Sequence, residues 1–264
     1  MGIVVVGLIA SGWLVPGGGD VRDVYRPAGD ALWNGHVVYV YDFPKYAPFL
    51  YAPPWAVVLA GLSRLPIALE WFLFDAANVA AIWYVAGGNW RRIGYLLWMP
   101  TIGSELVLGN MNLLVAAAIF AAVREGRTAL PAVMTFAKFS PVVAVDPRKW
   151  RSFALWLALG FAITVPWLWL WPEWIGQMGQ AFNHPVGDLV PIPFLVRLPF
   201  ALALAATRTR LGRAVGATLA IPGLYFLSLG TLIASISIGL DVLDERRVRR
   251  ALGSRPPQPS ASAG

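Results

Sequence analysis

The chain has 264 residues, of which 58% are hydrophobic and 13% are charged, and its formal net charge is +7. Charged residues are about half as frequent as in a typical soluble domain, which excludes an ordinary soluble globular protein. There is no cysteine and there are only two histidines, which excludes disulfides and His/Cys clusters that could hold a metal. A surplus of Lys and Arg is typical of cytoplasmic loops in membrane proteins, so we predict no nucleic-acid partner and no cofactor.

Apolar stretches follow one another along almost the whole chain. They lack the alternation of polar and apolar residues that a transmembrane β-barrel needs, so they favour helices, which satisfy their own backbone groups in lipid. The pattern predicts an all-α fold, a polytopic transmembrane helical bundle of roughly eight to ten segments in the cell membrane. The last stretch is long enough for one tilted span or for a hairpin. The stretches comprise residues 2–15, 53–66, 69–87, 93–107, 110–123, 128–145, 152–171, 188–206 and 214–240.

The first apolar stretch, 2–15, has no basic residue before it and no A-x-A cleavage site. We therefore expect a retained helix rather than a removable signal, although about 14 residues is short for a span. It leads into a loop, residues 16–50, in which acids outnumber bases, and this pattern favours the outer face of the membrane. Within the loop, the segment RPAGDALWNG predicts a short amphipathic helix that starts near Pro27 and ends at Asn34 and Gly35.

The basic residues predict the orientation of the remaining segments. We expect most of them to face the cytoplasm, together with a basic, disordered tail over residues 244–264 that follows a single transmembrane domain over residues 1–243. Two places conflict with this rule, because bases stand at both ends of the stretches near 69–87 and 128–145. Either some segments are re-entrant or some bases face outward. The bases concerned are Arg64 with Arg91 and Arg92, and Arg127 with Arg148.

The loop over residues 16–50 carries groups suited to sugar transfer. Asp20 and Asp23 are candidate bases for a sugar hydroxyl, because a carboxylate just above the membrane can accept its proton. The cations Arg22, Arg26 and Lys45 are candidates for binding a phosphate. The alternative is that these acids are simply solvated and that Arg22 pairs with a neighbouring Asp.

Two further polar residues stand out beyond that loop. Lys138 lies in the apolar segment TFAKFSPVV, where a base is costly and indicates either a functional site or an internal ion pair, with Glu105 as a possible partner. The alternative is that its side chain extends to the interface. His184 lies in a second expected outer loop, where it either contacts substrate or is only solvated.

Several segments resemble one family in their order along the chain. DVRDVYRPAGDALWNGHVVYVYD followed by FLYAPPWAVVLAGLSRLP resembles the start of the polyprenol-phosphate-mannose-dependent α-(1→2)-mannosyltransferases, glycosyltransferase family 87 of the GT-C superfamily. LGNMNLLVAAAIFAAVREGR resembles the family's Gly-Gln-x-Asn helix entry, with Asn110 in place of Gln. ALPAVMTFAKFSPVVAVDPRKWR resembles its Lys-x-x-Pro segment. The matching residues in the first segment are Asp20, Tyr25, Gly35, Tyr39, Tyr51, Pro53 and Pro54.

The resemblance implies an integral-membrane, GT-C-like glycosyltransferase with many spans, in the plasma membrane of a bacterium. It implies transfer of a hexose, mannose in the family, from a polyprenyl-phosphate donor to a lipid or glycan hydroxyl on the outer face, with inversion. Asp20 is the first choice of base and Asp23 the second, and Lys138 joins the phosphate-binding candidates. Tyr25, Tyr51, Asn112 and His184 are implied to contact substrate.

Two alternatives to an active enzyme of this family follow from the sequence. The family is usually longer, so we expect a short or truncated member, and an inactive homologue is one alternative. A transporter or flippase for a lipid or a lipid-linked sugar is another, because broken helices and an intramembrane lysine suit that class as well.

Overall fold

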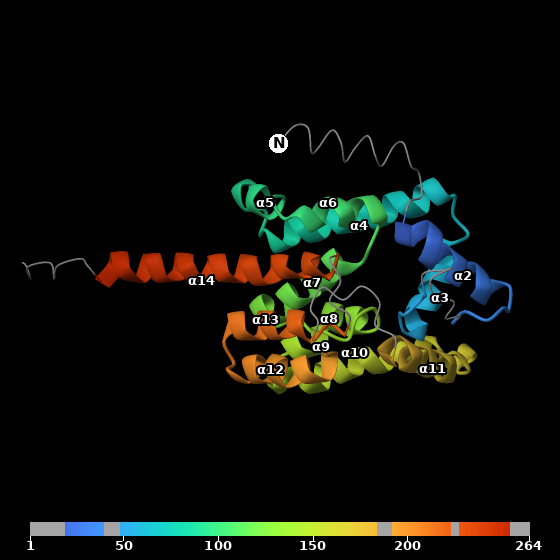
Figure 1. Cartoon of the computed structure of the whole chain (residues 1–264). Helices are drawn as coiled ribbons and strands as arrows, with labels where there is room; N and C mark the ends of the chain where they lie inside the picture. Colours follow the sequence, from blue (N-terminus) through green and yellow to red (C-terminus); the bar gives the residue numbers. More distant parts are fainter. Residues whose placement is uncertain (1–18, 40–47, 184–191, 223–226, 254–264) are drawn as a thin grey trace, which may run out of the picture.

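The computed structural model describes residues 19–39, 48–183, 192–222 and 227–253, and these residues form an assembly of helices (Figure 1). Within these ranges every regular element is helical and no strand occurs. The all-α prediction is therefore confirmed for the described residues. The predicted first span at 2–15 lies outside them, and so do Lys45 and His184.

The predicted amphipathic helix in the first loop is present. A single π-helical turn, η1 (Val21–Tyr25), runs into α2 (Arg26–Trp33), which carries a proline at its start. The helix stops where Gly35 adopts a left-handed conformation with φ of 70°. It packs closely on α3 (Pro53–Leu62): a Cβ placed on Gly29 would lie 2.4 Å from the Leu59 carbonyl oxygen.

The next part of the chain forms four α-helices and one π-helical turn. They are α4 (Ile67–Val85), α5 (Trp90–Leu96), α6 (Pro100–Leu108), α7 (Asn112–Phe120) and the π-helical turn η2 (Ala121–Glu125). Among the described residues, α4 is the one helix long and apolar enough to cross a membrane unaided, and α6 with α7–η2 passes the same test as a pair bent by 116°. The prediction of roughly eight to ten membrane segments thus stays a prediction.

The stretch predicted at 128–145 is a hairpin rather than a span. It holds two short helices, after which the chain turns into a longer one. The amino group of Lys149 donates to the Gly126 carbonyl at 2.7 Å, so both ends of the hairpin lie together. The bases at its two ends therefore lie on the same side of the molecule, which is the arrangement that a re-entrant segment would have. The elements are α8 (Ala129–Thr135), α9 (Pro141–Ala144), η3 (Pro147–Lys149) and α10 (Trp150–Ile163).

The C-terminal third forms a second layer in which α12 lies against α13. The stretch predicted at 214–240 takes the hairpin form, because α13 and α14 are separate helices that lie against each other. The buried guanidinium of Arg197 ties α12 to the segment after α13, since it donates to the carbonyls of Ile221 and Pro222 at 3.2 and 2.8 Å. The elements are η4 (Val165–Trp167), α11 (Leu170–Asn183), α12 (Phe194–Ala206), α13 (Arg210–Leu219), η5 (Leu227–Thr231) and α14 (Leu232–Gly253).

The prediction of disorder from residue 244 onward is wrong for its first ten residues, because α14 continues as a helix to Gly253. The segment DERRVRRAL contains no glycine or proline, and Arg, Leu, Ala and Glu are strong helix formers. The helix therefore continues past the body of the molecule, from which its second half projects (Figure 1). Residues 254–264 lie outside the described ranges.

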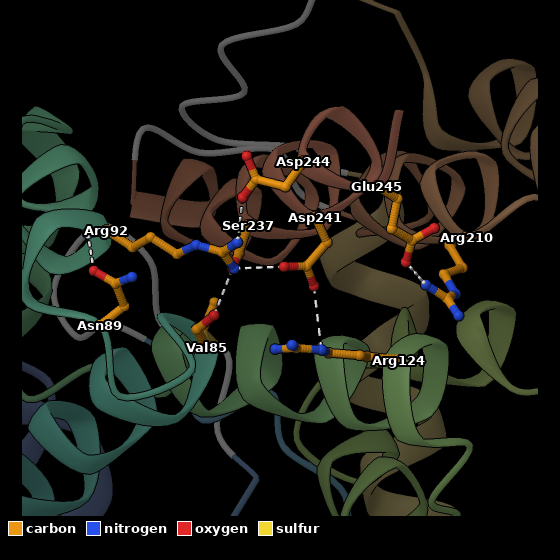
Figure 2. Close-up of polar contacts among 9 residues, drawn as sticks. All are labelled: Val85, Asn89, Arg92, Arg124, Arg210, Ser237, Asp241, Asp244 and Glu245. Atoms are coloured by element: carbon orange, nitrogen blue, oxygen red, sulfur yellow. Dashed lines mark hydrogen bonds and ion pairs between the residues drawn. The ribbon is translucent and has the colours of Figure 1, made fainter. Parts of the chain in front are cut away.

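The two ends of the molecule differ in charge. At one end, Asp241 of α14 pairs with Arg92 at 2.5 Å and with Arg124 at 3.1 Å, as Figure 2 shows. Arg64 lies at the other end, where it faces Asp30 of α2 at 3.8 Å. Arg64 and Arg92 thus lie at opposite ends of α4, Arg64 on the side of the first loop and Arg92 beside α14.

Large apolar side chains cover much of the surface between these ends. Trp98 is 80% exposed, Leu195 77% and Phe200 67%. In contrast, α7 is enclosed, and its Leu113, Val115, Ala116 and Ala118 have no exposed surface. An apolar exterior around an apolar core is expected of a protein surrounded by lipid.

Candidate active site

The centre of the site is a break in a helix. Between α6 and α7 the chain reads GNM, and the left-handed Gly109, with φ of 66°, ends α6. A Cβ on Gly109 would lie 2.5 Å from a methyl group of Val21, so the first turn of η1 packs directly on the break. This contact brings the start of the first loop to the positive, amino-terminal end of α7.

The Asp20 side chain is held at this break by an amide. Its carboxylate accepts a hydrogen bond from the side-chain amide of Asn110. Asn110 is fixed in turn, because its backbone carbonyl accepts from the Asn78 amide at 2.9 Å and its side-chain oxygen accepts from the Asn112 backbone N–H at 3.1 Å. Asp20 is therefore oriented by residues from two further helices.

The environment of Asp20 shifts its acidity. Burial raises the pKa of this carboxyl, while the positive charge of Lys138 and the hydrogen bond from Asn110 lower it. The balance leaves the pKa above the ordinary value of an aspartate. A carboxylate with a raised pKa is a better proton acceptor, which suits a general base.

A second polar chain runs beside the first. Lys138 lies at the tip of the α8–α9 hairpin, and its ammonium donates to the side-chain oxygen of Asn112. The amide of Asn112 donates to the Glu105 carboxylate at 2.6 Å. Both Asn112 and Glu105 are fully buried. The lysine therefore points inward to the helix break instead of outward to the interface. Among the described contacts it does not pair directly with Glu105, its predicted partner, because Asn112 lies between them and bonds to both.

Aromatic side chains form one wall of the site. Tyr25 is fully buried, and its hydroxyl lies 3.0 Å from that of Tyr51. The Tyr39 hydroxyl donates to the Tyr51 carbonyl at 2.9 Å, and the Tyr25 ring lies 5.1 Å from that of Phe74. These contacts fix the segment after the loop against η1 and α4.

Comparison with known proteins identifies the family of the chain. The model of glycosyltransferase family 87 matches residues 49–254. The chain belongs to glycosyltransferase family 87. It is 28% identical over 187 residues to a polyprenol-phosphate-mannose-dependent alpha-(1-2)-phosphatidylinositol pentamannoside mannosyltransferase of Mycolicibacterium smegmatis, a match covering 59% of this chain. The chain spans less than half of that relative, since the match covers 45% of its length. No solved structure matches the chain.

The family match bears unevenly on the site. It includes Glu105, Asn110, Asn112 and Lys138, but it begins after Asp20. The fold of this family 87 chain nevertheless brings Asp20 to the matched residues. Val21 packs on Gly109, and the Asp20 carboxylate accepts a hydrogen bond from Asn110.

The structure brings together only some of the residues that the sequence singled out. Asp20, Tyr25, Tyr51, Asn112 and Lys138 are all found around the helix break.

The other loop candidates point elsewhere. Arg22 and Asp23 are exposed and pair with each other at 2.9 Å. Arg26 pairs with the buried Glu70 at 3.0 Å, between α2 and α4. Its guanidinium is thereby committed to holding the loop on the helices.

Two residues of the site had little or no role in the sequence-based predictions. Asn110 was noted only as a departure from the family motif, and Asn78 was not singled out. Asn78 has a signal in retrospect, because it is a fully buried amide within the otherwise apolar half of α4. A polar side chain in such a segment is costly unless it has a partner, which here is Asn110.

Proposed function

We propose that this chain is an integral-membrane glycosyltransferase that moves a hexose from a polyprenyl-phosphate donor to a hydroxyl of a lipid or glycan. The observation that carries the proposal is the meeting of Asp20 and Lys138 at the break between α6 and α7. The carboxylate comes from the first loop and the ammonium from the re-entrant hairpin, and each is held by an asparagine of the break. Mannose is the proposed sugar, because the mycobacterial relative is named for a mannose donor.

The two charges divide the chemistry between them. Asp20 accepts the proton of the acceptor hydroxyl as that oxygen attacks the anomeric carbon, which contributes about 10²–10⁴-fold in rate. The bond from the anomeric carbon to the donor phosphate breaks at the same time, and the phosphate keeps the electron pair. Lys138 and the amino-terminal end of α7 offset the charge that grows on the phosphate. One attack opposite the leaving group inverts the anomeric centre.

Membrane placement supports a lipid-linked donor. The exposed apolar surface between the two ends suits contact with lipid, and a polyprenyl chain needs such surroundings. The acidic first loop lies at one end and the clustered arginines lie at the other. We propose that the end with Asp20 is the outer one, since basic ends face the cytoplasm.

The experiment uses purified protein in bilayer nanodiscs with polyprenyl-phosphate carrying radiolabelled mannose, together with a lipid extract as acceptor. Label appearing in a new glycolipid, with the anomeric configuration inverted, supports the proposal. Donor binding without any incorporation contradicts it and favours a lipid transporter or an inactive homologue. Movement of unaltered donor between leaflets of proteoliposomes separates these two, because only a transporter produces it.

A further inference from the structure

A groove lies at the basic end of the molecule, away from Asp20. It runs between the start of α13 and the middle of α14 and has a volume of about 340 Å³. Its walls are aliphatic except for one guanidinium, which lies on the side toward the C-terminal end of α14. The lining residues are Leu211, Ile236, Gly239, Leu240, Val242, Leu243 and Arg246.

The acids of α14 are already neutralised by other helices. Asp241 pairs with Arg92 and Arg124, and Asp244 pairs with Arg92 at 2.9 Å (Figure 2). Glu245 pairs with Arg210 at 2.7 Å, as the same figure shows. These bonds use the carboxylates of the helix and anchor α14 to α5, η2 and α13. They also leave the following arginines without acidic partners on α14.

Four arginines follow these acids on the projecting part of α14. In the part of the chain that the structure describes, none of the four pairs with a carboxylate, and all are exposed. They are Arg246, Arg247, Arg249 and Arg250. Helical geometry turns each residue by about 100°, so Arg246 and Arg250 continue the stripe of Gly239 and Leu243, whereas Arg249 lies farther round the helix.

We propose that this groove binds an anionic phospholipid of the surrounding membrane, with an acyl chain along its aliphatic walls and the phosphate on Arg246 and Arg250. The aliphatic side chains of the walls suit contact with an acyl chain. A guanidinium binds a phosphate through two parallel hydrogen bonds. Charge complementarity selects the ligand, since the neutralised acids do not repel a phosphate. The inference rests on the membrane placement proposed above, but not on sugar transfer.

The test compares lipid binding by native mass spectrometry of the full chain released from detergent. Phosphatidylglycerol should be retained in preference to phosphatidylcholine. Arg246→Gln together with Arg250→Gln should weaken phosphatidylglycerol binding by about tenfold or more, because each basic residue near the surface favours anionic lipid. Arg246→Gln and Arg249→Gln form the matched pair, because each removes one charge from the same helix, and Arg249→Gln should have a clearly smaller effect than Arg246→Gln.

A second variant tests the acyl chain independently of charge. A Cβ on Gly239 would lie 3.9 Å from Leu211, so Gly239→Leu enters the groove without a clash at its Cβ. This variant should lose phosphatidylglycerol while keeping all its arginines. Helical circular dichroism and an unchanged elution volume show that each variant is folded.

Three outcomes would overturn the proposal. Equal losses in Arg246→Gln and in Arg249→Gln would mean diffuse attraction to charge. Full binding by folded Gly239→Leu would place the lipid outside the groove. Displacement of the lipid by millimolar inorganic phosphate would mean that the arginines bind phosphate without the chain. Failure of sugar transfer would leave all three measurements unchanged, because none of these residues lies at the helix break.

Discussion

At the scale of single residues, the structure distinguishes two aspartates that the sequence places three positions apart. Asp20 is half-buried and accepts a hydrogen bond from Asn110, whereas Asp23 is exposed and pairs with Arg22. One turn of helix is enough to separate them, because η1 presents Asp20 to the helix break and Asp23 to the surface. The carboxylates therefore have different expected roles.

Replacement of these aspartates tests that difference. Asp20→Asn keeps the shape of the side chain but cannot accept a proton, so the transfer rate should fall by about 10²–10⁴-fold. Asp23→Asn removes only an exposed ion pair, which is worth little, and should leave transfer nearly unchanged. Initial rates at saturating donor measure both effects. Loss of transfer in Asp23→Asn, together with retained transfer in Asp20→Asn, would assign the base to Asp23.

The acidity of Asp20 predicts the pH dependence of transfer. A general base must be deprotonated, so transfer is lost as the pH falls through its pKa. Burial raises this pKa, so the acidic limb of the rate profile should lie above the ordinary aspartate value of about 3.9. Asn110→Ala removes a hydrogen bond that lowers the pKa and should move the limb to still higher pH. A profile of kcat/KM against pH that is identical in both proteins would contradict this role of Asn110.

Lys138 is expected to act through its charge. Lys138→Met leaves Asn112 and Glu105 without their cation and the donor phosphate without its counter-charge, so transfer should fall below detection. Lys138→Arg keeps the charge in a different shape and should retain part of the activity. Full activity of a folded Met variant would mean that the ammonium serves neither substrate nor catalysis.

At the scale of elements, the break between α6 and α7 is what makes a site out of apolar helices. A continuous helix would carry its side chains past one another, whereas the break turns the chain by 116° and directs Asn110 and Asn112 to opposite neighbours. The α8–α9 hairpin then supplies Lys138, whose ammonium donates to Asn112. Irregular backbone of this kind is tolerated in membranes only where protein or a cavity surrounds it.

Gly109 is the residue on which the break depends. Gly109→Ala adds a Cβ at a left-handed φ, which costs about 1–2 kcal/mol, and places it 2.5 Å from Val21. We expect a lower unfolding temperature and loss of transfer, since Asp20 directly precedes Val21. Gly94→Ala in α5 is the control, because a Cβ there meets nothing within 4 Å. It should be neutral or slightly stabilising, and an equal loss in both variants would remove the special role of Gly109.

At the scale of the whole molecule, charge separates the two ends. Arg92 and Arg124 meet α14 at one end, and Arg64 meets α2 at the other, with α4 between them. Such a division fixes the orientation of a membrane protein during insertion. The proposed orientation therefore fixes the side of the membrane on which both ends of the molecule lie.

Thiol labelling tests this orientation directly, because the natural chain contains no cysteine. A cysteine in place of the exposed His36 should react with an impermeant maleimide in intact cells. A cysteine in place of the exposed Arg148, at the basic end, should react only after the membrane is opened. The reverse labelling pattern would mean that the membrane orientation is opposite to the one proposed, with the Asp20 site on the cytoplasmic side.

The sequence alone determined the class of the protein and several local features. Composition established an apolar, helical chain, because the cost of unpaired backbone groups in lipid leaves few other choices. Pro27, Asn34 and Gly35 predicted α2 within a residue or two, because helix ends depend on nearby residues. The isolated Lys138 stood out because a base is costly in an apolar segment.

Tertiary structure decided everything that depends on contacts between distant parts of the chain. Asp20, Asn78, Asn110 and Lys138 are spread over more than a hundred residues, and no local pattern shows that they meet. The proposed assignment of the base to Asp20 and not Asp23 likewise rests on how η1 packs on Gly109. Side chains that share a helix face follow a fixed period, but contacts between helices depend on the packing of the whole core, which a single segment does not encode.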